Sequence, residues 1–199
     1  MALTLNGSNN TIAGVAVGGL PDGVVDNDMI ANTTIAEGKL AAGVNTIRET
    51  DIWRLTTTFD SSGTFITTNW ERADQDGAGR IGTGMSESSG VFTFPSTGIW
   101  NIKACATANK TGGNIRYAGG YLNTTINNSS YVEAGIALSH LRDTTNACWA
   151  SCVTETNFDV TDVSQCKCKL YVSSASSVSW VGSTTINYTF LAFTRLGDT

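Results

Sequence analysis

The chain has 199 residues and a net charge of −5, and only 15% of its residues are charged. This length is sufficient for one substantial core with a tethered segment, but not for two large domains. An acidic chain without a basic stripe is not suited to phosphate backbones, and no apolar run approaches the roughly 18 residues that span a bilayer. We therefore expect neither nucleic-acid binding nor membrane insertion. Abundant Thr, Ser, Asn and Gly favour an all-β protein.

The first 46 residues contain no aromatic side chain, whereas residues 47–199 contain all 5 Trp, 5 Tyr and 7 Phe. A segment without large side chains cannot bury enough area to offset the entropy lost on ordering its backbone. We expect it to associate with partner chains or with another protein. Its start lacks a basic residue followed by an apolar stretch, so no signal peptide is expected. The predicted domains are 1–46 and 47–199.

Residues 25–31 and 35–41 form a short internal repeat with a ten-residue offset. Asp28 and Thr34 are candidate N-caps for single helical turns. Two copies are too few for a solenoid within one chain, so the pattern predicts several chains side by side, as a short, extended and partly helical stem. The alternative is a flexible linker with chance similarity. The apolar repeat positions are Val25, Ile30, Ile35 and Leu40.

Residues 47–199 consist of short apolar runs separated by turn residues, the pattern of antiparallel strands. Trp100, Ile102 and Ala104 alternate with polar residues, as in a strand with one buried face. The last strand is apolar on both faces, which predicts one face toward the core and one toward another subunit. With no evident long helix, the pattern indicates a sandwich or jelly roll. The clearest candidate strands are 53–59, 99–106, 131–138, 165–172 and 187–196.

The run Gly90–Ile102 resembles the Gly-x-Phe…Pro…Gly-hydrophobic-aromatic signature of one jelly-roll domain. That domain is shared by complement collagen-like recognition proteins and the tumour necrosis factor superfamily. There is no collagen Gly-x-y repeat, which excludes a complement-type stalk. The signature and core positions are Phe92, Phe94, Pro95, Gly98 and Trp100.

The tract Gly18–Gly23, followed by the short repeats, resembles the stems of bacteriophage tail-fibre and capsid-fibre proteins, particularly those of marine cyanobacterial phages. The resemblance implies a parallel homotrimer whose stem binds other virion proteins and carries a distal jelly-roll head. It also implies a virion protein made in the host cytoplasm and released by lysis. An alternative is a capsid decoration or connector protein with a purely structural role.

We expect the head to bind a glycan or a protein on the host cell surface. Aromatic side chains can stack on sugar faces beside hydrogen-bonding Asn and Asp. The alternative for each aromatic residue is an ordinary core or interface position. The candidate receptor-binding residues are Trp70, Tyr117, Tyr121, Tyr131 and Trp149.

Catalytic, cofactor and metal chemistry are not expected. A single His has no nucleophile motif around it, and the acidic residues between 71 and 87 read as solvated turn residues rather than a glycosidase pair. The tract Asp74–Gly77 resembles a calcium loop but lacks the closing Glu, since position 85 is Met. We therefore expect no enzyme, no cofactor and no metal.

Five cysteines leave three alternatives open: a zinc site, a disulfide, or buried thiols. Their Cys-x3-Cys and Cys-x-Cys spacings are not those of a zinc knuckle, and an odd number without a signal peptide favours mostly free thiols. The five are Cys105, Cys148, Cys152, Cys166 and Cys168.

Overall fold

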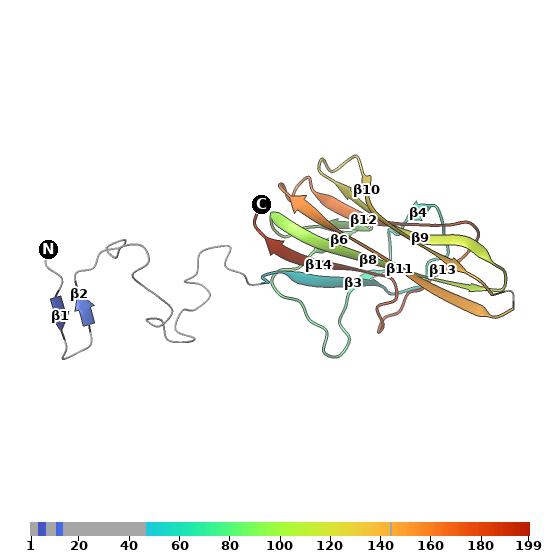
Figure 1. Cartoon of the computed structure of the whole chain (residues 1–199), viewed down its shortest axis with the longest axis horizontal. Coiled ribbons are helices and arrows are strands. Elements are labelled where there is room, and N and C mark those ends of the chain that lie inside the picture. Colours follow the sequence, from blue (N-terminus) through green and yellow to red (C-terminus); the bar gives the residue numbers. More distant parts are fainter. Residues whose placement is uncertain (1–3, 7–10, 14–46, 144) are drawn as a thin grey trace. The chain divides into compact units, whose positions relative to one another are not determined.

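Figure 1 shows the computed structural model of the chain, which describes residues 4–6, 11–13, 47–143 and 145–199. The chain forms two units, Met1–Val44 and Asn45–Thr199, and we call the second unit the head. In the first unit, strands β1 (Thr4–Asn6) and β2 (Thr11–Ala13) pair antiparallel. The four apolar positions of the predicted stem repeat lie outside the described residues: Val25, Ile30, Ile35 and Leu40.

Two six-stranded antiparallel sheets build the head. We name each after one of its long strands, the β8 sheet and the β9 sheet. The β8 sheet contains β11 (Ala147–Val160), β8 (Gly98–Thr111), β14 (Phe190–Gly197), β3 (Thr50–Leu55) and β5 (Trp70–Arg72), in that order, with β13 (Ser179–Trp180) paired to β8. The β9 sheet contains β10 (Val132–Leu141), β9 (Ile115–Thr125), β12 (Lys167–Ser174), β7 (Val91–Thr93) and β6 (Ser86–Ser88), with β4 (Thr64–Phe65) paired to β12.

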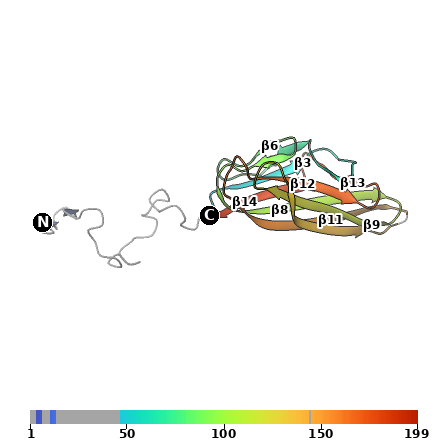
Figure 2. The same cartoon turned by 90° about the horizontal axis from the view of Figure 1, so that it is seen from above.

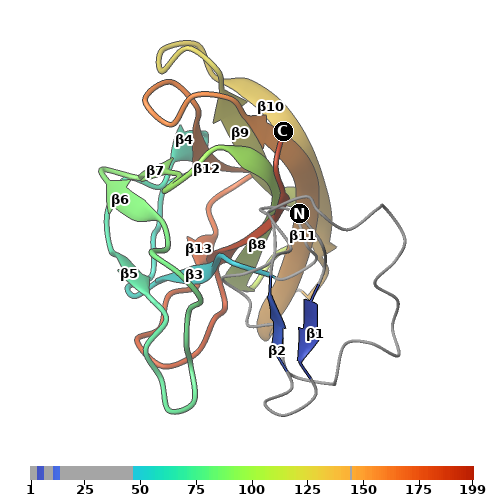
Figure 3. The ribbon, with the colours of Figure 1, turned by 90° about the vertical axis from the view of Figure 1, so that its left-hand side faces the viewer.

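The strands of both sheets run along the head, as Figure 2 shows from above and Figure 3 shows from one end. The core fills the space between the sheets. Trp100, Ile102 and Ala104 of β8 are buried there, as their alternation predicts, and so are Leu170 and Val172 of β12. Because the described residues contain strands and no helix, the prediction of an all-β jelly-roll sandwich is confirmed.

The aromatic core centres on Phe92, which is fully buried on β7. Its ring lies 5.8 Å from Trp53, 5.3 Å from Trp70 and 5.5 Å from Phe193, measured between ring centroids. Edge-to-face contacts of this kind add to the free energy gained from burial. Phe92 therefore joins β7 of one sheet to β3, β5 and β14 of the other.

The Gly-x-Phe…Pro…Gly signature has a structural explanation. Phe94 and Trp100 are buried, and the Trp100 indole donates a hydrogen bond of 3.2 Å to the carbonyl of Ser96 across the Pro95 turn. Gly98 has φ of 134°, and a Cβ there would lie 2.4 Å from the carbonyl oxygen of Gly197. The glycine thus allows the first residue of β8 to approach the end of β14.

The head begins and ends at the same place. Thr50 of β3 pairs with Thr194 of β14, and the amide of Arg195 donates to the carbonyl of Glu49. Figure 1 shows the C-terminus and the cyan start of the head at one end, with the tips of β9 and β11 at the other. No helix in the described part of the chain is long and apolar enough to cross a membrane.

Candidate binding surfaces

The outward face of the β8 sheet carries an apolar patch. In register across the sheet, Phe190 of β14 pairs with Cys105 of β8, which pairs with Val153 of β11. Paired residues share a face of a sheet, and Leu191 and Ala104, which adjoin this row, point into the core. The row therefore faces away from the core, although its residues are apolar.

Two further aromatic side chains extend this row. Trp149 of β11 and Tyr188, just before β14, have ring centroids 6.0 Å apart. Trp149 is 56% exposed and Val153 is 54% exposed, whereas Tyr188 and Phe190 are half-buried. We call Trp149, Val153, Tyr188 and Phe190 the β8-sheet patch. Large exposed apolar side chains clustered on one face are typical of interaction surfaces.

Cys105 lies beneath this patch and is almost fully buried. Burial raises the pKa of its thiol, and the hydrogen bond to Thr107 only partly opposes that shift. The Thr107 hydroxyl in turn contacts the Ser151 hydroxyl at 2.8 Å and donates to the carbonyl of Tyr188 at 2.7 Å. These bonds hold the segment that carries Tyr188 against β8 and β11.

A second apolar surface lies on β10, at the edge of the β9 sheet. Ile136 is 49% exposed and Leu138 is 56% exposed. Leu138 lies across Gly119, where a Cβ would come within 2.3 Å of the leucine Cδ2. We call Ile136 and Leu138 the β10 edge. Because β10 packs against β11, this surface borders the β8 sheet (Figure 3).

The outward face of β3 is covered by a charged network. Arg54 is fully buried there, although its side chain is charged. Its Nε and Nη2 atoms donate to Glu71 at 2.8 and 2.6 Å, and the guanidinium also pairs with Asp74 and Gln75. A buried charge is tolerated only when it is paired and hydrogen-bonded. In the acidic loop that resembles a calcium loop, the side-chain oxygens of Asp74 and Gln75 thus accept hydrogen bonds from an arginine.

The outward face of the β9 sheet carries a row of aromatic rings. The centroid of Phe65 lies 6.2 Å from that of Tyr131 and 5.3 Å from that of Tyr171, and Tyr171 lies 5.5 Å from Tyr121. The ammonium of Lys169 lies 4.3 Å from the Tyr131 centroid and 5.2 Å from the Phe65 centroid. We call these four rings and the lysine the aromatic row.

The structure brings together only part of the predicted receptor-binding set. Tyr121 and Tyr131 belong to the aromatic row, and Tyr117 lies four residues before Tyr121 on the same strand. Trp149 is on the other sheet. Trp70 is buried against Phe92, and its indole donates a hydrogen bond to the carbonyl of Ile66, so it is not available to a ligand.

Sequence reasoning did not select three members of the aromatic row as binding candidates. Lys169 and Tyr171 carried a usable signal, because strand alternation places them opposite the buried residues of β12. Phe65 carried none, since β4 has only two residues and its position depends on pairing with distant β12.

All five cysteines are free thiols. Cys152 and Cys168 are buried, and burial raises the pKa of both thiols. Within the described residues, no cluster of three or more His, Cys, Asp or Glu side chains could hold a metal ion. Four of the five thiols are buried, and that of Cys148 is half-buried.

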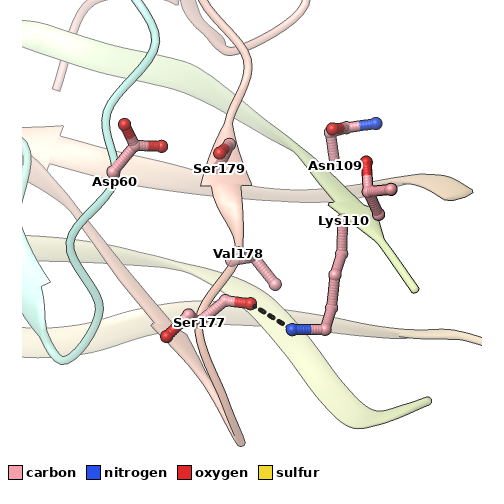
Figure 4. Close-up of a pocket in the computed structure, with 7 residues that line it drawn as sticks. Asp60, Asn109, Lys110, Ser177, Val178 and Ser179 are labelled. Atoms are coloured by element: carbon pink, nitrogen blue, oxygen red, sulfur yellow. Dashed lines mark hydrogen bonds between the residues drawn. The ribbon is translucent and has the colours of Figure 1, made fainter. Parts of the chain in front are cut away.

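A polar pocket of about 450 Å³ lies at the end of the head farthest from its termini, beside Asp60, Lys110 and Ser177. Figure 4 shows Lys110 directed at the Ser177 carbonyl, to which its ammonium donates a hydrogen bond of 3.0 Å. Its wall has few apolar side chains, unlike the mostly apolar wall of a typical small-molecule site. It is a weaker candidate than the surfaces described above.

No protein-family model matches the sequence, and a search of curated proteins finds no match. Solved structures do resemble the fold. The chain is similar to the Eiger TNF from S. frugiperda, with a TM-score of 0.58 and 10% identity, over 77% of this chain and 96% of that one. Murine APRIL in its crystal structure at pH 5.0 gives a TM-score of 0.51 and 12% identity, over 74% and 98% of the two chains. The head is therefore a jelly roll of the tumour-necrosis-factor type.

Proposed function

We propose that this chain is a trimeric binding appendage of a bacteriophage particle. The head associates side by side with two identical copies and recognises the host cell surface, without catalysis. Residues 1–46 form the stem and attach it to other virion proteins. The observation that carries the proposal is the β8-sheet patch, an apolar surface on the face of the sandwich that points away from its own core.

A second copy of the chain is the occupant that this surface fits. An obligate interface between subunits resembles a section through a protein core and is depleted of charge. Leu191 fills the core, whereas its two neighbours on the strand, Phe190 and Ala192, share the outward face, so β14 is apolar on both sides. This is the pattern that the sequence predicts for a strand placed between a core and a subunit interface.

The position of the β10 edge favours a closed ring over a two-fold dimer. A ring forms when one surface of each subunit contacts a different surface of the next, whereas a two-fold dimer uses one surface twice. The head has two such surfaces, the β8-sheet patch and the β10 edge. A trimer that joins them covers Trp149 and Val153 of one copy with Ile136 and Leu138 of the next.

The location on a virion rests on the sequence resemblance of residues 1–46 to phage fibre stems. The position of the head termini is compatible with this arrangement. Because Glu49 and Arg195 are bonded at one end, a stem that enters there leaves the rest of the head free for display. Several heads on one particle would raise the avidity of weak single contacts by about 10² to 10⁴.

Sedimentation of the full chain at micromolar concentration tests the assembly, and the expected mass is that of three copies. A monomeric mass contradicts the proposal. Adsorption of the labelled full chain to a panel of bacterial cells tests recognition. A stable trimer that adsorbs to no cell supports the alternative of a capsid decoration or connector protein.

A further inference from the structure

The aromatic row combines four packed rings with one positive charge, that of Lys169, beside Phe65 and Tyr131. Lys169 and Tyr171 both face outward from β12, and Tyr171 pairs in register with Tyr121 on β9 and Phe65 on β4. Since the rings of this row pack edge to face on each other, their orientation is fixed before any ligand arrives. A preorganised surface loses less entropy on binding than a flexible one.

Several polar groups of the row have no partner in the described part of the chain. No hydrogen bond joins the hydroxyls of Tyr121, Tyr131 or Tyr171 to another described residue, and Lys169 forms none of the ion pairs found there. Desolvation raises the pKa of Tyr121 and of Tyr131, so both phenols keep their protons at neutral pH and can donate. The row thus combines apolar ring surface with unused donors.

Lys169 gives this surface a cation held against aromatic rings. Its ammonium lies over the faces of Tyr131 and Phe65, and this contact positions the cation without neutralising it. Glu133 of β10 pairs in register with Asn123, which pairs with Lys169, but no ion pair joins the two charges, and the Glu133 carboxylate contributes to the raised pKa of Tyr121.

We propose that the aromatic row binds an acidic saccharide, with its carboxylate or sulfate group on Lys169. This inference rests on the proposed function, because it names the chemistry by which the head recognises a cell surface. A sugar ring presents an apolar C–H face that packs on an aromatic side chain and hydroxyl groups that accept from phenols. An anionic group on the same ring completes the ion pair that Lys169 lacks within the head.

Binding of the full chain to pairs of saccharides by nuclear magnetic resonance titration tests the chemistry. Suitable pairs are oligogalacturonate with its methyl ester, sialyllactose with lactose, and a sulfated heparin oligosaccharide with its desulfated form. At least one acidic member should bind, with affinity at least tenfold above its neutral partner. The proposal is overturned when no acidic member binds at millimolar concentration, or when acidic and neutral members bind alike.

Variants locate the site. Lys169→Gln should weaken binding of the acidic saccharide about 10- to 100-fold, the effect of one charge-assisted hydrogen bond. Tyr131→Ala should weaken both members of a pair by about tenfold through loss of stacking area. Lys110→Gln, which removes the same charge at the far end of the head, should leave affinity unchanged. Equal affinities of Lys169→Gln and the unsubstituted chain contradict the proposal, provided that both melt at the same temperature.

Cell adsorption separates this inference from the proposed function. Lys169→Gln should remain trimeric yet lose adsorption to a cell that the unsubstituted chain binds. If adsorption persists in Lys169→Gln, the inference is wrong while the proposed function stands. If the unsubstituted chain is trimeric and binds an acidic saccharide but adsorbs to no cell, the inference stands and recognition of a host surface fails.

Discussion

Replacement of Trp149 by alanine should weaken assembly far more than folding. The side chain is 56% exposed in the single chain. A tryptophan buries up to about 250 Å², so about 140 Å² remains for a neighbouring copy, and at about 25 cal/mol per Å² its burial stabilises each contact by about 3.5 kcal/mol. With three such contacts in a closed ring, Trp149→Ala should lower the free energy of assembly by about 10 kcal/mol.

Sedimentation equilibrium over a wide concentration range measures this effect. A loss of that size raises the concentration at half-dissociation by about three to four orders of magnitude. The folding of a single head should change less, because the contact of Trp149 with Tyr188 contributes only about 0.5–1.5 kcal/mol. Circular dichroism on the dissociated variant should therefore show an intact β fold.

Ile126→Ala is the matched control. Ile126 is even more exposed than Trp149 but belongs to neither the β8-sheet patch nor the β10 edge. It should leave the dissociation midpoint unchanged. Suppose that Trp149→Ala and Ile126→Ala both dissociate at the same midpoint concentration as the unsubstituted chain. Then the β8-sheet patch is not the interface, and the reasoning from the outward face of the β8 sheet is wrong.

Three further predictions concern folding and the thiols. Phe92→Ala should lower the free energy of unfolding by about 3–5 kcal/mol in urea, because it empties the centre of the aromatic core; a loss below about 1 kcal/mol would contradict that position. Backbone and side-chain donors at residues 145 and 146 hold the pKa of Asp143 at about 2, below its ordinary value. The ionised Asp143 carboxylate should therefore stabilise the fold fully at neutral pH, and this stabilisation should disappear as the pH falls through about 2. The difference in melting temperature between Asp143→Ala and the unsubstituted chain should vanish at that pH. Cys168 should resist a thiol reagent until the protein unfolds, whereas half-buried Cys148 should react first, as peptide mapping can show.

The alternation of β8 made its buried face predictable. Trp100, Ile102 and Ala104 recur every second residue, and a strand with one face in a core must follow this period. The same rule assigns Cys105 to the outward face, where the structure also places it. The rule could not predict that Cys105 is nearly buried, because its in-register neighbour on β14, Phe190, is distant in the sequence.

The candidate ligand residues were predictable only in part, for a similar reason. A loop aromatic and a core aromatic have the same sequence signature until tertiary contacts are known. Trp70 lies on a three-residue strand, and only its contact with Phe92 shows that it belongs to the core. Tyr131 joins the row through its contact with Phe65, and Tyr121 joins it through Tyr171, and both contacts depend on strand pairing with distant β12.

The β10 edge and the aromatic row adjoin each other, and this determines how variants in them should be interpreted. Ile136 of the β10 edge pairs in register with Tyr121, the last ring of the aromatic row. A substitution at either residue can therefore disturb both assembly and ligand binding. Lys169 and Tyr131 lie at the other end of the row, and Trp149 lies on the other sheet. Because sites without shared partners act independently, Lys169→Gln and Trp149→Ala should have additive effects on ligand affinity per head. A strong coupling between them would show instead that the ligand site is completed by a neighbouring copy.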